Sequence, residues 1–469
     1  MDNETLAFTP AVQLAEMIRQ KQLSPVELMT ALLARIEALN PRVNAFAYFA
    51  ADAAMDAARR AEAALMKDER IGRLHGIPAT IKDLAITKDM PTQMGSHIFA
   101  GNQPIEDTPI VPRLRAEGAI ILGKTTTSEF GWTGVSHSPL TGITHNPWKH
   151  GTNAGASSAG AGAASAAGFG PLHQGSDGAG SIRMPSHFCG VFGLKPTFGR
   201  VPYYPVGSGD YTSHMGPMTR TVADSALMLG VMSGPHPLDH TTCEAGPADY
   251  LGRLHEGIRG KRIAYSPDLG HARVDPEVAA VVKSAVAHFG ALGVTVEEVK
   301  TPWAGEGPEM IRFFWAAHMS RLTPHLAKWA SKMDPGLVAC IKASHDYSVT
   351  DYQLMRDRKM AYIAAIHRWF EDWDFLLTPA VSVAAFPAEK LMPDHWPQHE
   401  WDWLSWAEFS YPFNMSWNPA ASVPCGFTTD GLPIGLQIVG RRFDDLGVLQ
   451  ASAAFEQVQP WADKRPKLG

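Results

Sequence analysis

Hydrophobic residues near the start of the chain recur at helical spacing. Apolar side chains at positions 12, 15 and 18, after Pro10, predict a first helix. The next helix begins with Ser24 and Pro25 and has Glu27 at its third position, which predicts a capping box with a proline at the first helical position. Its apolar face continues for several turns, and we expect the helix to end before Pro41.

Further along the chain, short apolar runs alternate with helical segments. Strands are predicted at 76–83, 119–124, 261–267, 294–300 and 374–381, and helices at 50–67, 108–117, 159–170, 221–234 and 275–293. The strand–helix–strand order around 261–300 predicts an α/β protein with a mostly parallel sheet. Two apolar runs flank the pair Asp430–Gly431, which predicts a β-hairpin, and a last helix is expected over 445–458.

Composition and charge exclude several classes of protein. The 469 residues are 45% hydrophobic and 19% charged, and the net charge is −6 without a basic run, so no nucleic-acid partner is expected. No apolar run approaches the ~18 residues of a membrane span, and the first ten residues have no apolar leader, so we expect a cytoplasmic protein that enters no membrane. The four cysteines lack C-x-x-C spacing, which favours reduced thiols over disulfides or a zinc site.

A glycine- and alanine-rich stretch, 151–200, carries the candidate chemistry. It contains the pair Ser157–Ser158 and a third serine, Ser181, among small residues that let backbone N–H groups approach a ligand closely. Such a composition is also typical of a flexible linker. A linker, however, needs neither the apolar run FCGVFGLKP that follows nor the opposite charges of Asp177 and Arg183 around Ser181. We therefore interpret the stretch as a structured loop that positions hydroxyls and backbone donors.

These segments together resemble the amidase signature family. GASSAG, GSDGAGSIR and FCGVFGLKPTFGRV match its signature in order, and GIPATIKD places Lys82 where the family has a lysine. Ser157 lies 75 positions after Lys82, and Ser181 lies 24 positions after Ser157. The similarity continues through GPMTRTVADSALML to SVPCGFTTDGLPIGLQIVG and covers most of the chain. It implies a single α/β domain with a mixed, twisted sheet of about eleven strands, covered by helices on both faces.

The residues themselves fit hydrolysis of an acyl bond. Such chemistry needs a nucleophile, a base and donors for an oxyanion, and a serine is a weak nucleophile until a base activates it. No G-x-S-x-G elbow with a placed acid and histidine is found. A buried lysine can serve as the base because burial lowers its pKa, whereas a lysine that extends to the surface would be structural only.

The resemblance assigns roles to these residues. Lys82 would be the base, Ser157 a proton shuttle with a cis peptide bond, and Ser181 the nucleophile of an acyl-enzyme. The backbone N–H groups of Gly178, Ala179, Gly180 and Ser181 would form the oxyanion hole, and Ser158, Asp177 and Arg183 would hold the loop. No metal or organic cofactor is implied. Alanine at positions 156, 159 and 179 replaces glycines of the usual pattern, and Ala179 cannot adopt a positive φ without strain.

Aromatic residues gather after residue 395. Five tryptophans fall within 22 residues, together with Phe and Tyr side chains. They form either an aromatic packing patch or the apolar mouth of a substrate pocket. On the second interpretation the candidate substrate-binding residues are Tyr204, Tyr211, Trp403, Trp406 and Trp417, with Tyr203 as a further contributor. Such a site would suit apolar or aryl amides and, by the same chemistry, esters and carbamates (urethanes).

Neither an internal repeat nor a convincing linker divides the chain, so we expect one domain over 1–469. Within it we expect N-terminal helices over 1–70, the catalytic core over 71–300, a variable helical and aromatic-rich substrate-side region over 301–420, and strands and a helix over 421–469 that return to the core. The protein would act on small molecules as a monomer or homodimer.

Three alternatives remain at this point. The amidase (glutaminase) subunit of a tRNA-dependent amidotransferase resembles the same family, but its pocket needs charged groups for an amino acid. An α/β-hydrolase esterase would use Ser157, which lies in the near-match G-x-S-x-A, although the preceding TGITHNPWKHGTNA does not resemble a buried strand. A non-catalytic binding protein would not need Lys82, Ser157 and Ser181 together.

Overall fold

The computed structural model describes residues 1–207, 212–244 and 248–468. Its α-helices are α1 (Asn3–Phe8), α2 (Ala11–Arg19), α3 (Pro25–Val43), α4 (Ala51–Met66), α5 (Ile110–Ala116), α6 (Ala159–Ala167), α7 (Arg183–Cys189), α8 (Val222–Met232), α9 (Pro276–Ala287), α10 (Gly307–Met319), α11 (Thr323–Trp329), α12 (Pro335–Ala343), α13 (Val349–Trp369), α14 (Pro412–Met415) and α15 (Asp445–Val458). Its strands are β1 (Phe46–Phe49), β2 (Pro78–Lys82), β3 (Ile120–Thr125), β4 (His137–Ser138), β5 (Gly142–Ile143), β6 (Leu172–Asp177), β7 (Phe192–Lys195), β8 (His214–Thr219), β9 (Arg262–Tyr265), β10 (Thr295–Glu298), β11 (Phe375–Pro379), β12 (Ala420–Phe427) and β13 (Pro433–Gly440).

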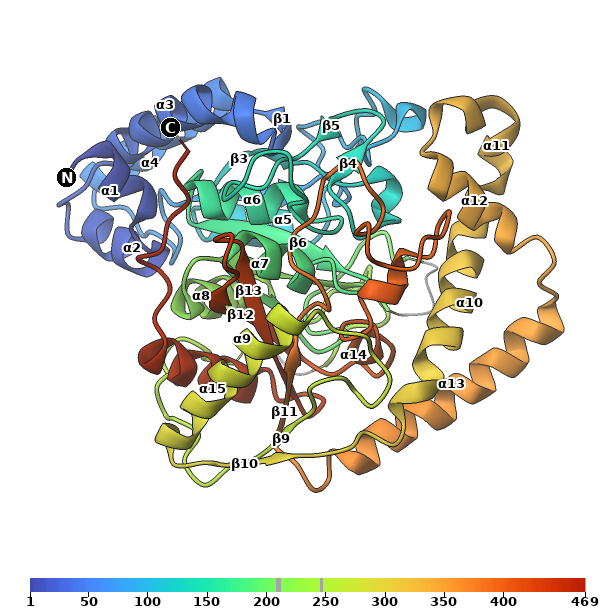
Figure 1. Ribbon diagram of the computed structural model, residues 1–469. Coiled ribbons are helices and arrows are strands. Elements are labelled where there is room, and N and C mark those ends of the chain that lie inside the picture. Colours follow the sequence, from blue (N-terminus) through green and yellow to red (C-terminus); the bar gives the residue numbers. More distant parts are fainter. Residues whose placement is uncertain (208–211, 245–247, 469) are drawn as a thin grey trace.

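One mixed sheet of eleven strands forms the centre of the molecule, in the order β1-β3-β2-β6-β8-β7-β12-β13-β11-β9-β10 (Figure 1). Parallel pairing joins β3, β2 and β6 on one side and β11, β9 and β10 on the other. From β6 to β11 every neighbouring pair is antiparallel. The expectation of a mostly parallel sheet is therefore wrong. The strand–helix–strand order describes only the two sides of the sheet. The centre contains the predicted hairpin, β12 and β13, whose strands are antiparallel.

Helices cover both faces of the sheet because neighbouring residues of each strand face opposite ways. Along β13, Ile438 packs into the core under α8, α9 and α15, whereas Val439 packs into a second core that includes residues of α7 and α10. Both residues are fully buried. The sheet is thus the central layer of one α/β domain.

The start of α3 departs from its prediction in two ways. Ser24 Oγ accepts N–H bonds from Val26 and Glu27, and its hydroxyl donates to Glu62. Among the described residues, however, no bond joins the Glu27 side chain to the Ser24 N–H, so the capping box is incomplete. The helix also continues past Pro41 to Val43, where Asn44 ends it in the left-handed conformation. Pro41 lacks an N–H to donate within the helix and its ring crowds the carbonyl four residues earlier, and the helix ends two residues later.

Helices α10 to α13 stand to one side of the sheet, opposite the N-terminal helices (Figure 1). Both chain ends lie on the N-terminal side, where Arg42 donates a hydrogen bond to the carbonyl of Leu468. Among the residues described, no helix has the length and apolarity needed to cross a membrane.

Candidate active site

Lys82 is the last residue of β2 and is fully buried. Its Nζ atom lies 2.7 Å from Ser157 Oγ, 2.9 Å from Ser158 Oγ and 3.0 Å from Ser176 Oγ. Burial lowers the pKa of Lys82 well below its ordinary value, although the negative charge of Asp177 acts in the opposite direction. Lys82 is therefore suited to be a neutral amine that exchanges protons with hydroxyl groups.

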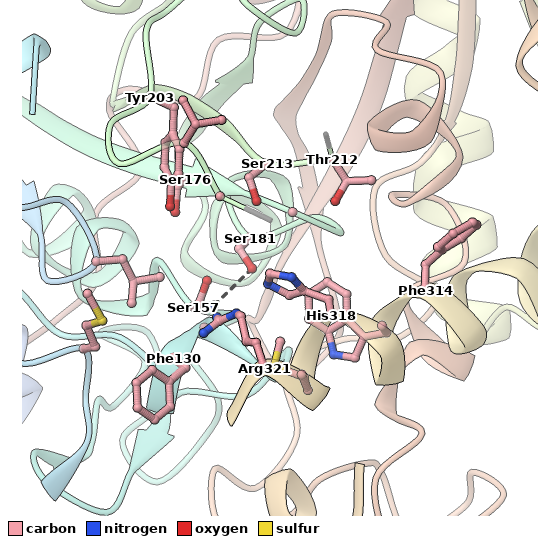
Figure 2. Close-up of a pocket in the computed structure, with 18 of the residues that line it drawn as sticks. Phe130, Ser157, Ser176, Ser181, Tyr203, Thr212, Ser213, Phe314, His318 and Arg321 are labelled. Carbon is pink, nitrogen blue, oxygen red and sulfur yellow. Dashed lines mark hydrogen bonds between the residues drawn. The ribbon is translucent and has the colours of Figure 1, made fainter. Parts of the chain in front are cut away.

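Parallel pairing explains how the lysine and the serines meet. β2 and β6 are parallel neighbours, so their carboxyl ends lie at the same edge of the sheet. Ser157 and Ser158 precede α6, and Ser181 lies in the connection between β6 and α7. The backbone N–H of Ser157 donates a hydrogen bond of 3.3 Å to Ser181 Oγ (Figure 2). The three predicted catalytic residues therefore form one contiguous cluster.

The expected cis peptide bond at Ser157 is not found. Within the described ranges, the one cis peptide bond joins Tyr204 to Pro205. Lys82 reaches the Ser157 hydroxyl with an ordinary trans peptide bond at that residue.

The loop between β6 and α7 turns tightly at Gly180. This glycine has a φ of +119°, and a Cβ atom there would overlap Met184 and lie 2.5 Å from Ser410 Oγ. Its N–H donates a 2.6 Å hydrogen bond to Asp177 Oδ1, so it is not available to an oxyanion, contrary to the predicted role. Ala179 has no positive φ, and the strain expected from replacing glycine there does not arise.

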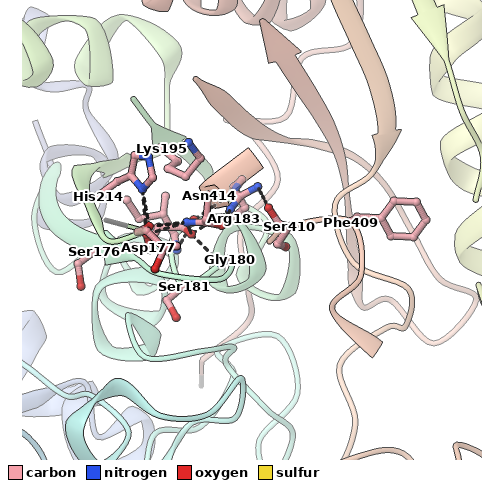
Figure 3. A network of polar contacts seen from close by, with 12 residues as sticks. Ser176, Asp177, Gly180, Ser181, Arg183, Lys195, His214, Phe409, Ser410 and Asn414 are labelled. Carbon is pink, nitrogen blue, oxygen red and sulfur yellow. Dashed lines mark hydrogen bonds and ion pairs between the residues drawn. The ribbon is translucent and has the colours of Figure 1, made fainter. Parts of the chain in front are cut away.

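Asp177 and Arg183 form the buried ion pair that fixes this loop (Figure 3). Arg183 donates to both carboxylate oxygens, at 3.0 and 2.9 Å, and Asn414 of α14 donates to Asp177 Oδ1 at 2.8 Å. Burial raises the pKa of the Asp177 carboxyl, but Arg183 outweighs that effect and holds the pKa well below its usual range. The Asp177 carboxylate therefore stays ionised and fixes the loop through its contacts with Arg183, Asn414 and the Gly180 N–H.

A pocket of about 290 Å³ opens over Ser157 and Ser181 (Figure 2). Its described lining comes from the serine loops, from residues between 84 and 131, from residues within 203–207 and 212–213, and from α10 and the turn after it. The residues are Leu84, Met94, Phe130, Gly131, Ser157, Ser176, Gly178, Ser181, Tyr203, Pro205, Val206, Gly207, Thr212, Ser213, Ile311, Phe314, Trp315, His318, Met319 and Arg321.

Most of the predicted substrate-binding residues lie elsewhere. Trp403 and Trp406 are fully buried in the aromatic core, where their indole N–H groups donate to the carbonyls of Trp132 and Leu391. Trp417 stacks against Arg442, and the exposed hydroxyl of Tyr204 donates to Glu106. None of these four is among the described lining residues. Tyr211 lies outside the described residues.

Sequence reasoning missed the aromatic wall that α10 contributes. Phe314 and Trp315 come from the helical, aromatic stretch of the substrate-side region, but only the fold shows which of its rings face the pocket. Ser176, which contacts Lys82, was also missed, although it directly precedes Asp177 in the signature. Within the part of the chain that the structure describes, no three His, Cys, Asp or Glu side chains are placed to hold a metal ion.

Comparison with known proteins shows the family of this chain. The Amidase family model matches residues 27–449. An acylamidase from Rhodococcus erythropolis is 38% identical over 480 residues, which cover 99% of this chain and 98% of the relative. A glutamyl-tRNA(Gln) amidotransferase subunit from Moorella thermoacetica is 33% identical over 489 residues, with 99% of each chain covered. The crystal structure of a bacterial aryl acylamidase of the amidase signature family superposes with a TM-score of 0.90 at 29% identity, over 98% of this chain and 99% of that one.

The chain therefore belongs to the amidase signature family of amide-hydrolysing enzymes. The α/β-hydrolase alternative is wrong: Ser157 follows a long loop after β5 and does not stand on a strand-to-helix elbow.

Proposed function

We propose that this enzyme hydrolyses apolar and aryl amides through an acyl-enzyme formed on Ser181. The observation that carries the proposal is the buried contact between Lys82 Nζ and Ser157 Oγ, with the backbone N–H of Ser157 donating to Ser181 Oγ beneath an aromatic pocket. Lys82 is the base, and Ser157 relays protons between it and the reacting atoms.

In the first half-reaction Ser181 Oγ attacks the amide carbonyl while its proton passes through Ser157 to Lys82. Rotation about the Cα–Cβ bond of Ser181 brings its hydroxyl to that of Ser157 as substrate binds. The protonated Lys82 returns the proton through Ser157 to the leaving nitrogen, the C–N bond breaks, and an ester on Ser181 remains. Water then attacks the ester by the same relay and releases the carboxylic acid.

The tetrahedral oxyanion needs backbone donors. Three backbone N–H groups are available for this role, those of Gly178, Ala179 and Ser181. None of them donates a hydrogen bond to any residue that the structure describes. Esters and carbamates would react by the same steps, and a carbamate would leave a carbonate-type or carbamoyl group on Ser181.

The alternative of an amidotransferase glutaminase fits the pocket less well. Free glutamine carries an α-ammonium group, and no carboxylate stands among the described lining residues to pair with it. Turnover of glutamine, but not of an anilide, by the purified protein would favour that alternative.

Hydrolysis of a nitroanilide by the purified protein tests the proposal, beside Lys82→Ala, Ser157→Ala and Ser181→Ala. We expect kcat/KM to fall by roughly 10³-fold or more in each variant, because the three groups act as a unit. Retained activity in Ser181→Ala would overturn the mechanism. An aryl carbamate and an aryl ester, assayed alongside, test the wider substrate range.

A further inference from the structure

The pocket over the two serines carries one charged side chain among its described lining residues. That residue is Arg321, which follows the carboxyl end of α10 and is drawn beside Ser157 and Ser181 in Figure 2. The rest of the described lining consists of glycine, proline, hydroxyl, aliphatic, thioether and aromatic side chains and one imidazole. A substrate therefore meets a positive charge that no carboxylate among the described lining residues offsets.

Unlike two nearby arginines, Arg321 forms no hydrogen bond or ion pair with a described residue. Arg312, nine residues earlier, forms an ion pair with Asp402 at 2.6 Å, and Arg358 of α13 pairs with Glu309 at 2.8 Å. No hydrogen bond or ion pair joins Arg321 to any residue within 1–207, 212–244 or 248–468. A guanidinium presents five donors in a planar fork that matches a carboxylate in a bidentate manner.

His318 adds a buried ring nitrogen on the same wall. Its Nδ1 atom is buried without a hydrogen-bond partner among the described residues, and it lies three positions before Arg321. Burial, together with the positive charge of Arg321, lowers the pKa of His318 to about 3. The imidazole is therefore neutral near pH 7 and offers one N–H donor without repelling a cationic neighbour.

We propose that Arg321 and His318 form a subsite for a substrate carboxylate, so that the enzyme prefers amides bearing a carboxylate near the scissile bond. The inference rests on the proposed function and narrows its substrate class. A free amino acid also carries a carboxylate, but its ammonium group would find no acidic counterpart among the described lining residues.

Matched anilides test this preference from both sides of the scissile bond. On the acyl side, the monoanilide of glutaric acid is compared with pentananilide and with the anilide of 5-aminopentanoic acid. On the leaving side, 4-acetamidobenzoate is compared with 4′-methylacetanilide. We expect wild-type kcat/KM to favour the carboxylate member of at least one pair by about 10- to 100-fold, as for a hydrogen-bonded charge.

The variants are Arg321→Gln, Arg321→Glu and His318→Asn, with Lys328→Gln as control. Lys328 is an exposed cation on α11 that does not line the pocket, so its removal reports the general effect of charge. Each ratio of kcat/KM is measured within one preparation, so partial misfolding of a variant cancels. We expect Arg321→Gln to lower the carboxylate preference about tenfold, mainly through KM, and Arg321→Glu to favour the ammonium-bearing anilide.

Equal kcat/KM for charged and neutral members in both pairs would overturn the inference. A ratio in Arg321→Gln equal to that in Lys328→Gln would overturn it as well. Failure of the proposed function gives a different result, namely no hydrolysis of any anilide by the wild-type enzyme.

Discussion

In the proposed mechanism, the side chain of Lys82 sets the pH range in which the enzyme works, because the base must be a neutral amine. Burial holds the pKa of Lys82 well below the ordinary value of 10.5. A lowered pKa means that the active form persists to lower pH and that activity falls only when the amine becomes protonated. We therefore expect kcat/KM for a neutral aryl amide to be level through the mildly alkaline range and to decline on the acid side.

The pH–rate profile of the wild-type enzyme measures this. A neutral anilide isolates the enzyme's own groups, because the substrate does not titrate. A profile that still rises between pH 9 and 11, toward the ordinary lysine pKa, would contradict a neutral Lys82.

Gly180 is the residue on which the shape of the loop between β6 and α7 depends. Its φ of +119° and its contacts with Met184 and Ser410 leave no room for a side chain. We expect Gly180→Ala to lower the free energy of unfolding by about 1–3 kcal/mol and to lower kcat by up to about 100-fold, since the adjacent Ser181 is displaced. Thermal unfolding and anilide hydrolysis measure the two effects.

Ala179→Gly is the matched control for Gly180→Ala. Ala179 has no positive φ, so removal of its methyl group should cost only about 0.5–1 kcal/mol and leave the loop in place. Equal losses in the two variants would show that the conformation of Gly180 is not the cause.

Residue identity and conformation were predictable to different degrees. Lys82, Ser157 and Ser181 could be placed together from sequence, because each falls in a short motif beside a strand end or a helix start. The role of the Gly180 N–H could not be predicted from sequence. This amide can donate to an oxyanion or to Asp177, and only the fold of the loop decides between them.

At the scale of elements, α10 lines the pocket, whereas the tryptophan-rich segment packs in the core. Phe314 of α10 lines the pocket, whereas Trp406 is fully buried against Phe188 and Phe386. We expect Phe314→Ala to raise KM for an aryl amide roughly tenfold or more, from the loss of apolar contact with the substrate. We expect Trp406→Ala to lower the free energy of unfolding by about 3–5 kcal/mol, with a smaller change in KM.

Because KM does not depend on the fraction of folded enzyme, the two variants can be compared in the same assay. A larger increase in KM for Trp406→Ala than for Phe314→Ala would indicate that Trp406 contributes more to substrate binding than Phe314 does.

Local sequence patterns predicted most elements but not their partners. The helix now seen as α9 and the hairpin of β12 and β13 follow from periodicity and a turn that are contained within a few residues. The burial of Trp406 depends on Leu391 and on the loop at Gly134, where a Cβ would meet the indole ring, and these contacts join distant segments. The antiparallel centre of the sheet is likewise a property of long-range pairing.

At the scale of the whole molecule, Glu129 connects the core to the helical region of α10–α13. Its carboxylate accepts an O–H bond from Ser96 and an N–H bond from Asp334, each at 2.7 Å, and Asp334 caps α12. Glu129 also directly precedes Phe130, which lines the pocket. The contact between the core and the helical region therefore contains a titratable carboxyl group next to the pocket.

Burial raises the pKa of Glu129 to about 7, from an ordinary value of 4.5. Between these pH values the folded protein keeps a proton that the unfolded chain releases, so the contribution of Glu129 to stability falls as pH rises from 4.5 to 7. Glu129→Gln removes that titration and leaves an amide that can still accept from Asp334. Relative to wild type, we expect the variant to gain stability from pH 5 to pH 8 by at most about 3 kcal/mol.

Thermal or urea unfolding of both proteins at several pH values measures this difference. Subtraction of the two curves removes the contribution of the buried histidines to the pH dependence. Their pKa values are lowered, so their contribution to stability decreases as pH falls, whereas that of Glu129 increases. Glu37→Gln, on the exposed face of α3, controls for the removal of one negative charge. If the Glu129→Gln and wild-type curves run parallel from pH 5 to pH 8, Glu129 does not take up a proton in the folded state, and the two regions are joined by an ionised carboxylate.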